Sequence, residues 1–174
     1  MRIAATVAAV YALYLLALFF LQRDMIFVGR RRGPAPEAPS LQAGIERIWL
    51  DVDGGRVGSY YWPASQLPAP ALIFAHGNAG LIEGWPRSLT ALRDLGLSPM
   101  MVEYPGYGRS GGSASEASIG RTFELAFDRL ASDRRVQDGR ILAYGCSLGS
   151  SATAISPRWL NWAGLGESMV RNKF

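Results

Sequence analysis

The pentapeptide Gly145-Cys146-Ser147-Leu148-Gly149 has the Gly-x-Ser-x-Gly spacing of a nucleophilic serine. An apolar run, Ile141 to Tyr144, precedes it, and the helix-compatible segment "LGSSATAIS" follows it. In a strand-to-helix turn of this kind the serine backbone is strained, and the flanking glycines let the strand and the helix approach closely. The turn raises the hydroxyl above the carboxyl end of the sheet, where open α/β sheets bind ligands. The sequence therefore predicts Ser147 as a catalytic nucleophile.

A second match to the same pattern occurs at Gly108-Arg109-Ser110-Gly111-Gly112. It lies in a glycine-rich loop that no strand enters directly, so the strand-to-helix context is missing there. We therefore assign the nucleophile to Ser147 and not to Ser110.

The loop Ala75 to Gly80, "AHGNAG", directly follows a predicted buried strand at Ala71–Ala75. An oxyanion hole takes one backbone amide from the residue after the nucleophile and another from a loop in this place. We expect the backbone amides of Leu148 and Asn78 to fill these roles. The loop serves to present amides, so we do not assign His76 as the general base.

Residues Gly106 to Gly111 spell Gly-x-Gly-x-x-Gly, the dinucleotide-binding fingerprint, and provide an alternative function. That fingerprint needs a helix opening inside the motif and an acidic residue about 20 positions later, at the end of the next strand. Here Glu124 and Asp128 fall within the next predicted helix, and Pro105 with the glycines delays that helix to about Ser115. Dinucleotide binding is therefore the less favoured hypothesis.

The order of predicted elements indicates an α/β fold. An antiparallel hairpin comes first, followed by parallel strands that alternate with helices, as in the N-terminal half of a doubly wound sheet. A possible capping box at Ser113 and Glu116 precedes the second helix of the body. The predicted strands are Glu46–Val52, Arg56–Trp62, Ala71–Ala75, Pro99–Tyr104 and Ile141–Tyr144, and the helical patterns cover Trp85–Leu95 and Ile119–Leu130.

The N-terminal segment Ile3 to Leu21 contains 19 residues without a charge, which predicts one transmembrane helix in contact with the lipid bilayer. Residues 1–32 contain five arginines and one aspartate and so carry the whole net charge of +4. One arginine precedes the apolar segment and four follow it, which favours a cytoplasmic body. We divide the chain into a transmembrane helix (3–21), a basic, proline-rich linker (22–44), a partial α/β domain (45–156) and an atypical tail (157–174).

Composition excludes several classes of function. Apolar residues make up 49% of the chain, as expected for a folded domain. Charges in the body cancel, so we expect no nucleic-acid partner. One cysteine and one histidine cannot supply the three or four ligands of a zinc site, and we predict no metal and no cofactor. The sequence does not indicate an oligomeric state.

These motifs resemble the α/β-hydrolase superfamily, and within it the membrane-anchored serine hydrolases of the prolyl-oligopeptidase and serine-aminopeptidase branch. The resemblance rests on four segments in the same order: "QRDMIF", "HGNAG", "EYPGYGRSGG" and "GRILAYGCSLGS". It implies the N-terminal half of an α/β-hydrolase sheet. It also implies hydrolysis of an ester, thioester or amide through an acyl-enzyme on Ser147, with the Asn78 and Leu148 amides binding the oxyanion.

One departure from the superfamily pattern concerns the catalytic partners of the serine. In this fold the acid and the histidine follow the nucleophile along the chain. Only 27 residues follow Ser147, the last 19 contain neither histidine nor aspartate, and Pro157 should interrupt the helix after the serine. We therefore expect a truncated and inactive hydrolase. A non-catalytic membrane-bound remnant or binding module is the alternative.

Overall fold

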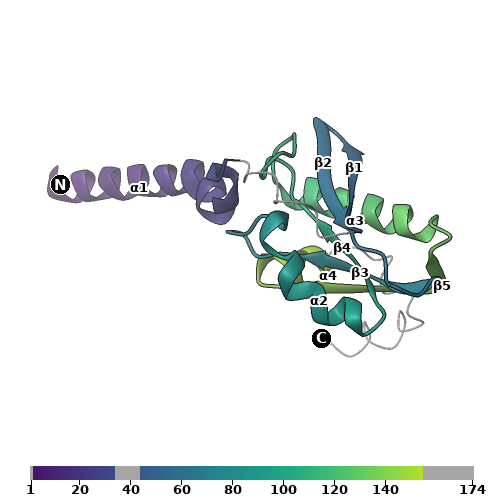
Figure 1. Ribbon diagram of the computed structural model, residues 1–174. Helices are drawn as coiled ribbons and strands as arrows, with labels where there is room; N and C mark the ends of the chain where they lie inside the picture. Colours follow the sequence, from purple (N-terminus) through teal and green to yellow (C-terminus); the bar gives the residue numbers. More distant parts are fainter. Residues whose placement is uncertain (1, 34–43, 155–174) are drawn as a thin grey trace, which may run out of the picture.

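The computed structural model describes residues 2–33 and 44–154, in which a long N-terminal helix projects from an α/β body (Figure 1). Five strands form one sheet in the order β1-β2-β4-β3-β5. Their bounds are β1 Glu46–Val52, β2 Gly55–Tyr61, β3 Ala69–Ala75, β4 Ser98–Val102 and β5 Val136–Gly145. The helices are α1 Arg2–Ile26, α2 Pro86–Asp94, α3 Glu116–Ala131 and α4 Leu148–Ala154, with short 3-10 turns η1 Val28–Arg31 and η2 Ile82–Gly84.

The pairing of the strands follows the predicted topology. Strands β1 and β2 form an antiparallel hairpin across the two-residue turn Asp53-Gly54, where Gly54 has a φ of +86° that glycine adopts without strain. Strand β2 pairs antiparallel with β4, and β3 pairs parallel with both β4 and β5. The predicted α/β class, with a hairpin followed by parallel strands, is confirmed.

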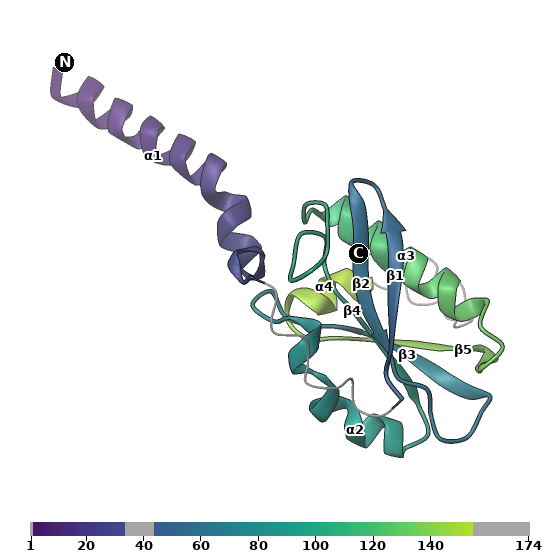
Figure 2. The ribbon, with the colours of Figure 1, turned by 45° about the horizontal axis from the view of Figure 1, so that its top comes forward.

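Helices cover both faces of the sheet, as Figures 1 and 2 show for α2 and α3. Because successive strand residues point to opposite faces, Ile73 and Met100 join Phe123 of α3 in one buried cluster. Phe74 and Met101, one position further along, belong to the second cluster on the side of α2. The central strands are therefore apolar on both faces, which explains their unbroken apolar runs.

The capping box of α3 and the start of β5 differ from the sequence expectation. The N-cap of α3 is Ser115, whose hydroxyl accepts a hydrogen bond from the Ser118 amide at 3.1 Å, so the capping box joins Ser115 and Ser118 and not Ser113 and Glu116. Strand β5 begins at Val136, earlier than predicted, because Val136 pairs with Ala69 across an irregularity in the ladder. Both differences depend on backbone contacts that a Ser-x-x-Glu match or an apolar run does not encode.

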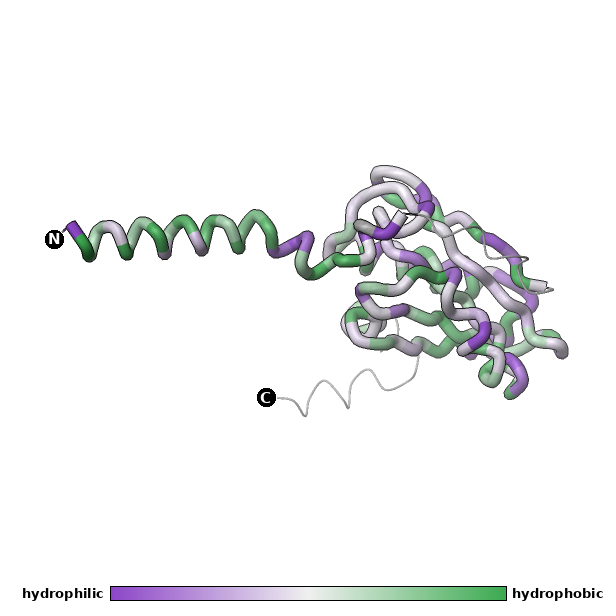
Figure 3. The backbone as a smooth tube through the Cα atoms, turned by 60° about the vertical axis from the view of Figure 1, so that its left-hand side comes forward, coloured by the Kyte–Doolittle hydropathy of each residue, from purple (hydrophilic) through white to green (hydrophobic). Residues whose placement is uncertain are grey.

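Helix α1 contains no buried residue and carries a long stretch of hydrophobic positions, as the hydropathy colouring of Figure 3 shows. At 1.5 Å per residue its 25 residues span about 38 Å, enough to cross a hydrocarbon core of about 30 Å. Length and composition thus allow α1 to span a membrane. The helix continues to Ile26, and the next residue, Phe27, is buried in the core of the body.

Candidate functional site

Ser147 occupies a strained turn between β5 and α4. Its φ is +56°, and among the described residues it is the only non-glycine residue with a positive φ. The flanking glycines are required by space, because a side chain on Gly145 would overlap the carbonyl of Gly149, and one on Gly149 would overlap the carbonyl of Ala75. The strand and the helix therefore meet with no side chain between them, as the Gly-x-Ser-x-Gly pattern predicts.

Backbone hydrogen bonds fix this turn at the carboxyl end of the sheet. The amide of Cys146 donates to the carbonyl of Ala75, the last residue of β3, at 3.0 Å. The amide of Ser150 donates to the carbonyl of Ser147 at 2.8 Å and starts α4. The Ser147 side chain is exposed, and its hydroxyl has no hydrogen-bond partner among the residues that the structure describes. It is therefore accessible to solvent.

The loop after β3 lies against the Ser147 turn. A Cβ atom added to Gly77 would lie 3.6 Å from the Cβ of Ser147. The backbone amides of Asn78 and Leu148 donate no hydrogen bond within residues 2–33 and 44–154, whereas those of Gly80 and Gly149 do. The structure thus brings the two predicted loops together and leaves both predicted amides unpaired, while their role as an oxyanion hole stays a prediction.

His76 is buried and fully engaged in hydrogen bonds. Its Nε2 lies 2.6 Å from Oε1 of Glu103, and its Nδ1 lies 2.8 Å from the carbonyl oxygen of Gly77. The side chain of His76 is 0% exposed and that of Glu103 is 2% exposed. With both ring nitrogens occupied, His76 cannot also accept a proton from Ser147. These two contacts hold the ring inside the loop, and the expectation that His76 is not the base stays a prediction.

The Glu103 carboxylate links the ends of β3 and β4 to the segment that contains Ile82. Oε1 of Glu103 accepts a hydrogen bond from the Tyr104 amide at 3.0 Å, and Oε2 accepts one from the Ile82 amide at 3.1 Å. The Tyr104 hydroxyl donates to the carbonyl of His76, and burial raises the pKa of Tyr104 so that this hydroxyl stays neutral. These contacts hold the Asn78 loop in a fixed position beside Ser147.

Sequence reasoning did not identify Glu103. The register pairs Ala75 with Val102 in adjacent parallel strands, so the next residues along each strand, His76 and Glu103, are neighbours. A polar residue after each of two buried strands was the available signal. The strand order had to be known before the two could be joined.

The other glycine-rich segment, Gly106 to Gly112, is hydrogen-bonded to strand β2. The Ser110 hydroxyl accepts a hydrogen bond from the Gly58 amide at 3.0 Å, and the Gly111 amide donates to the carbonyl of Arg56 at 2.9 Å. The loop therefore packs on the β1-β2 hairpin. Dinucleotide binding requires a helix that opens inside the motif. Helix α3 begins only at Glu116, so no helix opens within Gly106–Gly111.

The chain resembles known proteins over most of its length. No protein-family model matches it. The uncharacterized protein Rv2307c of Mycobacterium tuberculosis is 33% identical over 151 residues, which cover 86% of this chain and 53% of that protein. The alpha/beta hydrolase domain-containing protein WAV2 of Arabidopsis thaliana is 28% identical, over 77% of this chain and 46% of that protein. The chain spans about half the length of the curated relatives it matches.

The crystal structure of an α/β hydrolase from Vibrio vulnificus superposes with a TM-score of 0.68 and 20% identity, over 85% of this chain and 54% of that one. The chain therefore has the α/β-hydrolase fold. Its strand-to-helix turn lies at the carboxyl edge of the sheet. The fold was therefore identified correctly from the four ordered motifs.

One contact in this fold was not predicted from the sequence. The end of α1 contacts the Asn78 loop directly, because Nδ2 of Asn78 donates to the carbonyl of Ile26 at 3.1 Å and the amide of Gly29 donates to the carbonyl of Asn78 at 2.9 Å. The sequence placed residues 22–44 in a linker and offered no signal for this contact. The N-terminal helix and the predicted oxyanion loop are thus one connected unit.

Proposed function

We propose that the chain is a membrane-anchored serine hydrolase that acts on ester, thioester or amide bonds through an acyl-enzyme on Ser147. The observation that carries this proposal is the φ of +56° at Ser147. A left-handed conformation costs a non-glycine residue about 1–2 kcal/mol, and such strain is concentrated at functional sites. The exposed hydroxyl and the unpaired amides of Asn78 and Leu148 support the same role.

The proposed chemistry follows from this arrangement. The Ser147 Oγ attacks the substrate carbonyl carbon and forms a C–O bond, while the hydroxyl proton passes to a base. The carbonyl oxygen becomes an oxyanion that the two amides bind. Collapse of this intermediate expels the alcohol, thiol or amine with a proton from the base, and water then hydrolyses the acyl-enzyme.

The base is the missing part of the proposal. The only histidine of the sequence, His76, is committed to Glu103 and Gly77. An unassisted serine hydroxyl is a weak nucleophile at neutral pH. We therefore propose that residues 1–174 do not turn over substrate by themselves and that the base has to come from outside them.

The anchor is the second part of the proposal. Helix α1 is 0% buried over its most apolar window, unlike the core helix of a soluble protein, which would be packed against its own domain. The arginines that follow the apolar run favour a body on the cytoplasmic side.

Labelling with a fluorophosphonate probe in the presence of imidazole tests the nucleophile. Imidazole supplies a base of the missing kind, so we expect labelling of the wild type to rise with imidazole concentration and to stay at background without it. Ser147→Ala should lose the imidazole-dependent labelling. Ser110→Ala, at the other Gly-x-Ser-x-Gly match, should retain it.

Equal imidazole-dependent labelling of the wild type and Ser147→Ala would overturn the assignment of the nucleophile. No labelling of a folded wild-type sample at any imidazole concentration would favour the non-catalytic binding module. Rapid labelling without imidazole would overturn the proposal that these residues lack a working base.

A further inference from the structure

The boundary between the apolar helix and the body is a packed contact. Phe27 is buried among core residues, and the Asn78 loop exchanges two hydrogen bonds with Ile26 and Gly29. A side chain on Gly29 would overlap the ring of Tyr107 and come within 2.7 Å of the Asn78 carbonyl oxygen. The helix and the body therefore have one defined mutual orientation, which a flexible linker would not give.

This contact places Ser147 near the end of the apolar helix. From Leu21, the last residue of the uncharged run, to Ile26 the helix rises about 8 Å. The path then passes through the Asn78 side chain and Gly77, whose added Cβ would lie 3.6 Å from the Cβ of Ser147. With standard backbone dimensions this path limits the Cα–Cα distance from Leu21 to Ser147 to roughly 28 Å, and the true distance is shorter because the path bends.

Exposed apolar side chains continue from the helix up to the body. Met25 is 63% exposed, Ile26 48% and Val28 41%, although all three lie beyond the charged residues that end the uncharged run. Water is an unfavourable environment for such a group, and a lipid interface is a favourable one. The bilayer surface is thereby placed at the level of Met25 to Val28, next to the Asn78 loop.

Charged groups at the same level suit lipid headgroups. Arg23 donates to the carbonyl of Ala114 at 2.9 Å, and Arg30 pairs with Asp24 at 3.0 Å, so both guanidinium groups are held beside the body. Arg32 is exposed. Basic residues next to a membrane span are attracted to anionic lipid headgroups.

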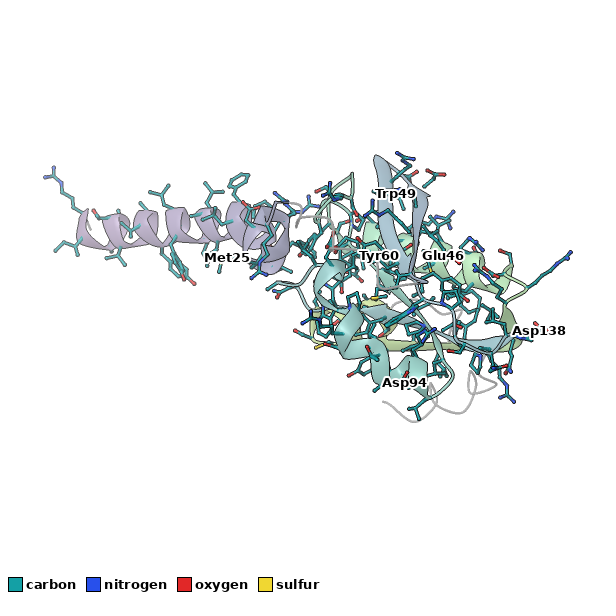
Figure 4. All side chains as sticks on the ribbon, in the orientation of Figure 1. Met25, Glu46, Trp49, Tyr60, Asp94 and Asp138 are labelled. Carbon is teal, nitrogen blue, oxygen red and sulfur yellow. The ribbon has the colours of Figure 1, made fainter. Side chains whose placement is uncertain are left out.

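The turn that carries Ser147 lies on the side of the body to which α1 is attached, as Figures 1 and 2 both show. The N-terminal end of β5 lies at the opposite side. In Figure 4, Met25 marks the junction of α1 with the body, and Asp138 marks the opposite side of the body.

We infer that the Ser147 site opens onto the lipid interface and that its substrates are carboxylic esters of bilayer-resident acyl lipids. This inference rests on the proposed anchor and nucleophile and adds the substrate class. A lipid ester lies at the boundary between hydrocarbon and headgroups, so it reaches Ser147 without leaving the bilayer. A water-soluble ester has no such advantage.

The depth of the site is measured with the full chain in vesicles of phosphatidylcholine and phosphatidylserine. Cys146, the only cysteine of the sequence, is exposed beside Ser147 and takes a fluorescent maleimide. The matched control is Cys146→Ser combined with Asp138→Cys, which moves the label by roughly 13–20 Å toward the other end of β5, since Val136–Gly145 runs beside Ala69–Ala75. We expect headgroup nitroxide lipids to quench the Cys146 label several-fold more than the control label. Equal quenching at the two positions would overturn the inference.

The substrate class is tested with two fluorophosphonates, both with imidazole present. One carries a long alkyl chain and is embedded in the vesicles, and the other is short and soluble. At equal total concentration we expect labelling of Ser147 to be about tenfold faster with the embedded reagent, because confinement raises its effective concentration at the site. Equal or faster labelling by the soluble reagent would overturn the lipid inference and leave the nucleophile intact. If neither reagent labels while the Cys146 label is quenched, the proposed nucleophile fails and the placement of the site at the interface stands.

Discussion

Glycine at position 147 should make the chain more stable than alanine does. Ser147 has a φ of +56°, and the left-handed region costs a residue with a Cβ about 1–2 kcal/mol, which glycine does not incur. Glycine loses about 0.5–1 kcal/mol more backbone entropy on folding than alanine. The serine side chain is exposed, so neither variant loses buried contacts. The net expectation is that Ser147→Gly exceeds Ser147→Ala by about 0.5–1 kcal/mol in free energy of unfolding.

The second Gly-x-Ser-x-Gly serine provides the matched control. Ser110 has no positive φ, so glycine brings only the entropic cost there, and Ser110→Gly should be less stable than Ser110→Ala by about 0.5–1 kcal/mol. The four variants are compared by equilibrium denaturation of the full chain in detergent, followed by the fluorescence of the tryptophans in the body. The reasoning is refuted if Ser147→Gly is no more stable than Ser147→Ala, since the turn would then not be strained.

Three further substitutions test contacts that stabilise the fold. The Arg135 guanidinium lowers the pKa of Asp133 to about 2, so the ionised carboxylate stabilises the fold fully above about pH 4 and this stabilisation is lost as the pH falls through about 2. Asp133→Asn should therefore lower the free energy of unfolding by about 1–2 kcal/mol at pH 7. Denaturation at several pH values should show the difference in free energy between wild type and variant shrinking toward pH 2. Gly29→Ala should lower the free energy of unfolding by about 1–3 kcal/mol because the added methyl group overpacks the contact with Tyr107 and the Asn78 carbonyl. Gly33→Ala should have no effect, because there is open space around Gly33. A Gly29→Ala variant with the stability of the wild type would contradict the close contact of helix and loop. His76→Ala should destabilise the chain by about 2–3 kcal/mol because it removes one of the hydrogen-bond partners of the buried Glu103 carboxylate and leaves a cavity. A variant as stable as the wild type in the same denaturation assay would contradict a structural role.

The sequence predicted the parts of this molecule that short segments determine. Gly145, Ser147 and Gly149 are close in the chain, and the strain and close packing of their turn are local properties that a five-residue pattern records. The central strands were identified because burial on both faces demands unbroken apolar runs. The fold class then followed from the order of the elements.

The contacts that the sequence could not predict join distant segments. Glu103 meets His76 only because β3 and β4 are neighbours in the sheet, and Gly29 meets Asn78 only because α1 ends against the body. A hydrogen bond between residues far apart in the chain leaves no periodic pattern in the sequence. The capping box of α3 was assigned to the wrong residues for a related reason, since Ser113 and Ser115 both fit a cap and only the backbone conformation of Ser115 decides between them.

The burial of Phe27 limits how the chain can be trimmed for work in water. A version that starts after residue 33 would lose the Phe27 side chain from the core, at a cost of about 3–5 kcal/mol. The Asn78 carbonyl would also lose its hydrogen bond from the Gly29 amide. A version that starts near residue 22 would lack the apolar run but retain Phe27 in the core. The few residues between the two cut points are therefore a part of the body, although they follow the helix without a break.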